Sequence, residues 1–270
     1  MEGNVVSFKV FINSKGHVMS EYSKLPVEKL ATIFDDDDAA LMKKILNEVD
    51  NKKDFTYQWN LSSLKPGGLY GLKLFSRQKG AKKIQDSIIG SFVLPSEKSS
   101  KDAVKFCVVS CHDFNRRDDI KNGHKIYPSM DKIKPDFYIH TGDIEYMDKP
   151  NPYALTEELM RFKWNRLFSL PFQRSFYNKY TSYFMKDDHD IGFNDSYPGR
   201  DYGSVPFERG LEIFDFEQFP TYKKRYKTVR WGRDLQIWIV EGRNYRSPNN
   251  LIDGPEKTIW GCLLYTSPSP

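Results

Sequence analysis

Short apolar segments separated by turn residues fill the first hundred positions of this 270-residue chain. Strand-like runs lie at 5–13, 54–64, 69–78 and 88–94. One helix is expected among them, over 37–49. Several short strands joined by turn signals are typical of a β-sandwich of the fibronectin type III or immunoglobulin kind. We therefore predict an N-terminal β-sandwich domain over 1–98.

The pattern changes after a polar stretch rich in serine and lysine, 95–102, which we interpret as a linker. Beyond it, apolar segments of strand length alternate with helical ones. The predicted strands are 104–110, 137–139, 183–185 and 235–240, and the predicted helices are 129–134, 156–180 with a break at Pro171, and 208–216. The first strand is a continuous apolar run, so burial on both of its faces is expected. This alternation indicates an α/β domain over 99–261.

The last residues, 262–270, do not continue the preceding pattern. Their sequence, CLLYTSPSP, resembles the translated read-through of a sequencing adapter, and we interpret it as a non-native tail. The authentic protein is then expected to continue beyond Gly261, so that the α/β domain of this chain is incomplete.

Charge and cysteine content argue against several classes of protein. The net charge of +5 is spread along the chain, so a nucleic-acid partner is not expected. Apolar runs stay shorter than the ~18 residues of a membrane span. Three cysteines are too few and too scattered for a disulfide framework. The first residues lack the features of a signal peptide, so the protein is expected to be either cytoplasmic or the product of a longer, exported precursor. The sequence does not indicate an oligomeric state.

Residues with catalytic or metal-binding chemistry follow each predicted strand of the α/β domain. They are Ser110-Cys111-His112-Asp113, Gly142-Asp143 with Tyr146, Asp187-Asp188-His189-Asp190, and Glu241 with Arg243 and Arg246. Each group alone has an ordinary explanation, such as a packed thiol, a solvated acidic turn or a surface ion pair. Ligands gather beyond the carboxyl ends of strands in α/β proteins, so the groups together predict one shared site.

The donor types predict a metal site of mixed character. Asp143, Asp188 and Asn194 offer hard oxygen atoms, which suit calcium, magnesium, manganese or ferric iron. Cys111 offers a soft thiolate, which calcium would not select, so at least two metal positions are expected. Asp143 follows the middle strand and is the best placed residue to bridge them.

A bridged pair of metal ions predicts hydrolysis of phosphate esters, with a hydroxide held between the metals on Asp143 as the nucleophile. His189, whose pKa the neighbouring carboxylates would raise, is expected to donate a proton to the leaving group or to stabilise the transition state. Arg243 is expected to hold the phosphate through two hydrogen bonds.

The order and spacing of these motifs resemble the PhoD-like family of alkaline phosphatases and phosphodiesterases, within the calcineurin-like metallophosphatases. The matching segments are Ser110-Cys111, HxGDxxY at 140–146, DDHD at 187–190 with Asn194-Asp195, and 241–246 after a strand. The resemblance covers about 104–261, and the preceding β domain resembles the family's N-terminal sandwich. It implies that the second domain is a double-sheet α/β sandwich.

The resemblance also implies a set of metal ligands. Ferric iron and calcium would be held by a cysteine, a tyrosine and a bridging aspartate, which here are Cys111, Tyr146 and Asp143, with Asp188 on the neighbouring ion. Manganese, magnesium and zinc remain open. His140 precedes the glycine turn and is expected to orient the site rather than bind metal.

Two positions depart from the family pattern. Lys186 stands where a tryptophan is common before DDHD, and Val240-Glu241-Gly242-Arg243 stands where LDxR is common. Lys186 and the incomplete domain favour an alternative, a non-catalytic binding protein with a degenerate phosphatase domain. The sequence leaves the ester class open between monoesters and diesters.

Overall fold

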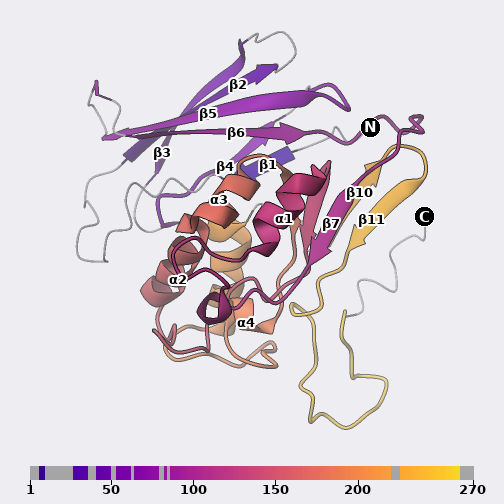
Figure 1. The fold of residues 1–270 in the computed structure, drawn as a ribbon. Coiled ribbons are helices and arrows are strands. Elements are labelled where there is room, and N and C mark those ends of the chain that lie inside the picture. Colours follow the sequence, from indigo (N-terminus) through magenta and orange to yellow (C-terminus); the bar gives the residue numbers. More distant parts are fainter. Residues whose placement is uncertain are drawn as a thin grey trace.

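Antiparallel strands make up the N-terminal region, where they form two sheets (Figure 1). We describe the fold from a computed structural model, which defines residues 6–9, 27–35, 41–49, 53–61, 64–78, 82–83, 86–219 and 226–261. The larger sheet has the strand order β3-β2-β5-β6. Its members are β2 Val27–Asp35, β3 Leu41–Val49, β5 Leu69–Gln78 and β6 Asp86–Val93. The smaller sheet pairs β1, Val6–Lys9, with β4, Gln58–Leu61.

The two N-terminal sheets share a small apolar core. Leu61 of β4 is buried in one cluster with residues of β5 and β6 and the residue that follows β6. The other members are Tyr70, Leu72, Leu74, Phe92 and Leu94. The predicted strands of this region are therefore present within the described residues, while their arrangement as a β-sandwich stays a prediction.

The helix predicted over 37–49 is wrong for its described part. Residues Leu41–Val49 form β3, which pairs antiparallel with β2 from Val27↔Val49 to Phe34↔Leu41. The segment, LMKKILNEV, combines good helix formers with an apolar spacing that fits a helix as well as a strand. Pairing with a neighbouring strand overrides such local preferences, because strand formation depends on tertiary context.

The second half of the chain is built on a parallel sheet of order β7-β8-β9. Its strands are β7 Phe106–Val109, β8 Phe137–His140 and β9 Thr181–Phe184. The connecting helices are α1 Ile126–Ile133, α2 Glu157–Ser169 and α3 Pro171–Tyr177. Two short α-helices, α4 Asp188–Ile191 and α5 Phe207–Glu212, and a π-helix at Ile213–Gln218 follow β9. The strand–helix alternation and the helix break at Pro171 are as predicted.

Different layers cover the two faces of this sheet (Figure 1). On one face, Tyr138 of β8 packs with Tyr127 and Met130 of α1 and Phe176 of α3. On the other face, Phe137 and Ile139 pack with Trp231. Trp231 belongs to the antiparallel hairpin of β10, Lys227–Trp231, and β11, Leu235–Ile239. Among the described residues, the longest helices are too short and polar to cross a membrane.

Strand β7 is less buried than its apolar sequence predicts. Cys107 and Val109 are partly covered by the helical layer. Phe106 and Val108 point to the opposite face and are 41% and 52% exposed. Phe137 and Ile139, the equivalent residues of β8, are buried against Trp231 of the β10–β11 hairpin. The expectation of burial on both faces is therefore wrong for β7, whereas all four residues of β8 are buried.

Candidate metal centre

The turns after β7 and β8 are bonded to each other through their backbones. The N–H of Cys111 donates to the carbonyl of Gly142 at 3.2 Å, and the N–H of His112 donates to the carbonyl of Asp143 at 2.8 Å. Cys111 and Asp143 both adopt left-handed backbone conformations, with φ of 59° and 54°. Such conformations are unusual for residues with a side chain and persist where surrounding contacts enforce them. Here they bring the Cys111 sulfur to 3.6 Å from Asp143 Oδ2.

Gly142 is required where the turn after β8 meets the turn after β9. Its φ is 109°, and a Cβ added there would lie 2.6 Å from Asp187 Cβ and 2.7 Å from the Asp187 nitrogen. A larger residue would therefore push the two turns apart. The glycine of the GD motif thus allows the carboxylate after β8 to approach the residues after β9.

Asp190, which is almost fully buried, connects these two turns. Its carboxylate accepts hydrogen bonds from the amides of Asp143, Ile144 and Glu145, at 2.8 to 3.0 Å, and from the amide of Asp187 at 2.9 Å. The sequence placed Asp190 only within an acidic run. Its spacing of three residues from Asp187, in a helix-capping box, is the signal that could have identified this structural role.

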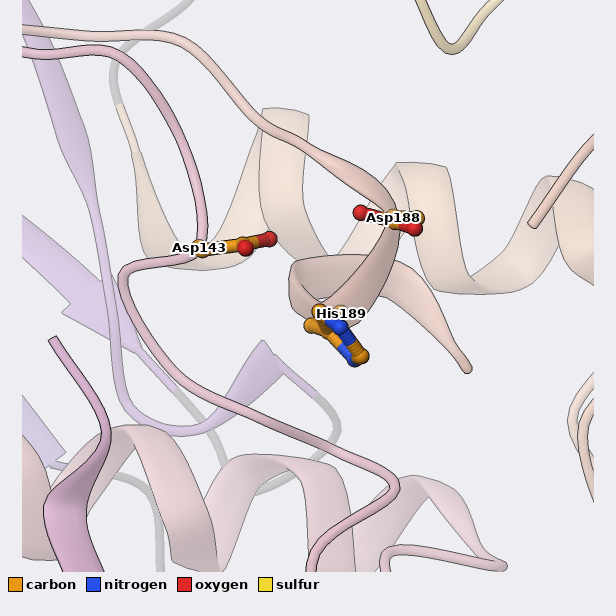
Figure 2. Close-up of side chains that lie close together, drawn as sticks. All are labelled: Asp143, Asp188 and His189. Carbon is orange, nitrogen blue, oxygen red and sulfur yellow. The ribbon is translucent and has the colours of Figure 1, made fainter. Parts of the chain in front are cut away.

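Asp143, Asp188 and His189 form the centre of the site (Figure 2). One candidate ligand atom from each lies within 4.8 Å of the other two. Figure 2 shows Asp143 projecting from the turn after β8 toward the turn that carries Asp188 and His189. Asp143 Oδ1 is buried without a hydrogen-bond partner. A buried, unpaired carboxylate oxygen is costly, and a bound cation would satisfy it, so the carboxylates of Asp143 and Asp188 fit a metal ion, with His189 beside them.

A second set of donors lies on the Oδ2 side of Asp143. The Tyr146 hydroxyl donates to Asp143 Oδ2 at 3.2 Å, and the Cys111 sulfur approaches the same oxygen. Burial, with the charge of Asp143, raises the pKa of the Tyr146 phenol, and burial also raises the pKa of Asp143. A cation at this position would offset the negative charge that raises the phenol pKa. Asp143 is therefore within reach of both donor sets, as a bridging ligand must be.

His189 is oriented by a carboxylate that the sequence did not single out. Its Nδ1 lies 2.7 Å from Asp148 Oδ1, and its ring packs on Tyr146 with centroids 4.4 Å apart. Burial would lower the pKa of His189, but the hydrogen bond to Asp148 and the charges of Asp148, Asp143 and Asp188 raise it overall. Asp148 follows no strand directly and belongs to no motif used above; its position five residues after Asp143 was the available signal.

The structure brings Cys111, Asp143, Tyr146, Asp188 and His189 together, whereas Asn194 and Arg243 contact the edge of this group. The side chain of Asn194 donates to Asp195 at 3.1 Å, and its amide donates to Asp148 at 3.0 Å. Arg243 bonds to Asp187, lies 3.4 Å from Asp188 Oδ1 and donates to the carbonyl of Ser196. The guanidinium of Arg243 therefore contacts carboxylates. A bound phosphate would have to compete with these carboxylates for the N–H donors of Arg243.

The two departures from the family pattern meet in one buried ion cluster. Lys186 Nζ lies 2.9 Å from Asp215 Oδ1 and 3.0 Å from Glu241 Oε2, and all of these side chains are at most 6% exposed. The cluster ties the end of β9 to the end of β11 and to the π-helix. Lys186 thus has a structural explanation and does not favour a degenerate phosphatase domain.

His140 lies behind the turn after β8, fully buried. Its Nδ1 accepts from the amide of Gly142 at 3.3 Å, and its Nε2 is 3.1 Å from His112 Nδ1. Burial, with the neighbouring His112, holds the pKa of His140 well below its usual value, so the ring is neutral. His140 therefore contacts the turn that carries Asp143, and its role in orienting the site stays a prediction.

The fold of this chain resembles that of solved phosphatases. A search of solved structures finds PhoD, with a TM-score of 0.72 and 16% identity, covering 89% of this chain and 52% of that one. It also finds the purple acid phosphatase PPD1 from yellow lupin (Lupinus luteus) seeds, with a TM-score of 0.53 and 11% identity, covering 84% and 42%. The chain therefore spans about half the length of these proteins. No family model matches the sequence, and no curated protein matches it.

Proposed function

We propose that this chain belongs to a metal-dependent hydrolase of phosphate esters. The observation that carries the proposal is the Asp143, Asp188 and His189 group, with its unsatisfied Asp143 oxygen, at the strand ends of a phosphatase-like fold. We also propose the division into a β-sandwich domain at 1–98, a partial catalytic domain at 99–261 and a non-native tail at 262–270.

The two donor sets around Asp143 would hold unlike ions. Cys111 and Tyr146 suit a ferric or similarly thiolate-tolerant ion, and Asp188 with Asn194 suits calcium or another hard cation. When bound, the ions would supply a hydroxide near neutral pH and positive charge for the phosphoryl oxygens. Asp143 would hold both ions at a fixed separation, because its turn is bonded to the turns on either side.

His189 would handle the proton of the leaving group. Its Nδ1 is engaged by Asp148, so the other ring nitrogen is the one that can face a substrate. The raised pKa of His189 favours the imidazolium, which is the form that can donate a proton to an alkoxide. Arg243 would contribute positive charge beside Asp188 and would reach a phosphate by releasing one of its carboxylate contacts.

Replacement of Asp143 by asparagine tests this proposal. In a preparation of the complete protein, D143N should lose at least one bound metal ion per chain and hydrolyse p-nitrophenyl phosphate and bis-p-nitrophenyl phosphate at least about 100-fold more slowly. Elemental analysis and initial rates provide the measurements. D253N, at a carboxylate that is 93% exposed, serves as the matched control and should keep both properties. Unchanged hydrolysis in D143N would overturn the proposal.

A further inference from the structure

A lysine with no role in the proposed chemistry packs against the loop that carries Tyr146 and Asp148. Lys163, on α2, is fully buried. Its ammonium donates to three backbone carbonyls of one loop: that of Tyr146, that of Met147 at 3.2 Å and that of Lys149 at 2.8 Å. These contacts use the three donors that a lysine ammonium offers.

Burying an ammonium is costly, so its retention requires that its donors be satisfied. Burial lowers the pKa of Lys163 to about 8. The carbonyls that satisfy it must point inward, toward one atom, and this requirement fixes the curvature of the loop 146–149. The loop is therefore shaped in part by a side chain from a different element, Lys163 of α2.

The same loop presents two residues of the metal centre. The Tyr146 hydroxyl bonds to Asp143, and Asp148 bonds to His189. The loop is also tied to the turn after β9, because the amide of Met147 donates to the carbonyl of His189 at 2.9 Å. Movement of the loop carbonyls would consequently move both the phenol and the carboxylate that orients the histidine.

A second residue of α2, one helical turn further on, supports the same loop. Arg166 lies 3.2 Å from Glu145 Oε1, which also accepts the amide of Tyr146 at 3.0 Å, and Arg166 donates to the carbonyl of Asn151. Lys163 and Arg166, separated by three positions, lie on one face of the helix. Helix α2 thus contacts Glu145 before the loop, the carbonyls of the loop itself, and Asn151 after it.

We propose that Lys163 is a positioning residue, whose ammonium holds the loop 146–149 so that Tyr146 and Asp148 face the metal centre. It acts through these two residues and touches neither metal nor substrate. The inference rests on the proposed function only where activity is measured, because the position of the loop can be measured independently.

Substitution K163M, in the full chain, removes the donors and keeps the length of the side chain. Hydrogen exchange of the Met147 and Asn194 amides, which bond to His189 and Asp148, should become at least about 10-fold faster. Exchange at Ile139, in β8, should stay unchanged. A loss of general stability would instead accelerate all three. Titration of the metal-free protein with Mn²⁺ should show affinity about 10- to 100-fold weaker than in the wild type.

A double-mutant cycle tests whether Lys163 acts through Asp148. If it does, K163M should slow phosphate-ester hydrolysis in the wild type and should cost much less in a D148N background. Control K179M removes an exposed lysine that bonds to Asp131, and should change none of these measurements. Should K163M fail to fold, K163Q, which keeps two N–H donors, is measured in its place.

Two results together would overturn the role assigned to Lys163. Amide exchange at Met147 and Asn194 would stay within twofold of the wild type, and so would the affinity for Mn²⁺. Absence of hydrolysis in the wild-type protein would count against the proposed function alone, because the exchange and metal measurements would still decide the role of Lys163.

Discussion

Two groups of buried charges lie side by side at the carboxyl end of β9, and they are neutralised in different ways. In the first, Lys186 is in contact with Asp215 and Glu241, so a cation from the chain itself faces the carboxylates. In the second, Asp143 and Asp188 face His189, and Arg243 lies at the edge of the group, 3.4 Å from Asp188. Residues 186 and 188 are only two positions apart, yet they belong to different clusters.

The comparison shows how a structural acidic cluster differs from a metal-directed one. Carboxylates with a buried lysine between them need no further cation and serve packing. In the second group, burial and the charges of Asp187 and Asp188 raise the pKa of Asp143, and a bound cation would lower it again. The two clusters should therefore respond oppositely to mutation.

The largest effect is expected for the Lys186 cluster. Substitution K186M removes the lysine that contacts Asp215 and Glu241, leaving Lys227 as a nearby positive charge, and should destabilise the protein by about 3 kcal/mol, as measured by urea unfolding of the metal-free protein. Metal stoichiometry of the folded fraction should stay at the wild-type value. Loss of metal without loss of stability would show that Lys186 belongs functionally to the metal centre.

Substitution D188N should have the converse effect. It removes a candidate ligand, so Mn²⁺ affinity should fall about 10- to 100-fold. The metal-free protein should unfold within about 1 kcal/mol of the wild type, because the lost contact with Arg243 is offset by relief of repulsion with Asp143. Isothermal titration and urea unfolding separate the two effects. A variant with normal Mn²⁺ affinity would remove Asp188 from the ligand set.

The sequence predicted that the residues at the centre of the site lie together because these residues follow strands directly; their role as ligands stays a prediction. Cys111, Asp143 and the Asp188-His189 pair lie at the ends of three adjacent parallel strands, and parallel order makes such ends converge. Asp148 and Lys163 were missed because their roles depend on the path of a loop and on which helix lies beneath it. Neither property has a periodic signal in the sequence.

Those parts of the fold with a clear periodic pattern in the sequence were also predicted correctly. Helix–strand alternation after residue 104 has a clear periodicity, and the structure confirms it. The pattern of the segment Leu41–Val49 is compatible with a helix or a strand, and the segment forms a strand because it pairs with β2. The exposure of Phe106 and Val108 depends on which segments pack on that face of the sheet, and the sequence of β7 does not encode this.

A third prediction concerns the neutral histidines behind the ligand turns. Burial and the nearby His124 lower the pKa of His112 to about 4, below its ordinary 6.5. The native state therefore binds fewer protons than the unfolded state, so stability is complete above pH 6.5 and is lost as the pH falls toward 4. At pH 5 this residue alone should cost about 2 kcal/mol relative to pH 7.5.

Urea unfolding of the metal-free protein at both pH values measures this loss. Substitution H112Q keeps a polar side chain and removes the titration, so its stability should fall less between pH 7.5 and pH 5, by about 2 kcal/mol. The comparison of the two proteins cancels contributions from the carboxylates. Equal losses in both would mean that His112 is not held neutral by the fold.

The smallest effect is expected for the pair that orients His189. The pKa of His189 is raised above its ordinary value by Asp148, against the effect of burial, so the pair stabilises the fold fully below pH 6.5. That contribution is lost as the pH rises through the folded-state pKa.

D148N should therefore destabilise the metal-free protein by about 1 kcal/mol at pH 6 and by less at pH 9. D131N removes the carboxylate partner of Lys179, an ion pair without a histidine, and should show the same small effect at both pH values. NMR titration of the His189 ring in D148N should show a lower pKa than in the wild type. An unchanged pKa would mean that Asp148 contacts the histidine without holding its proton, and the difference between the two charge clusters would then rest on Asp143 and Asp188 alone.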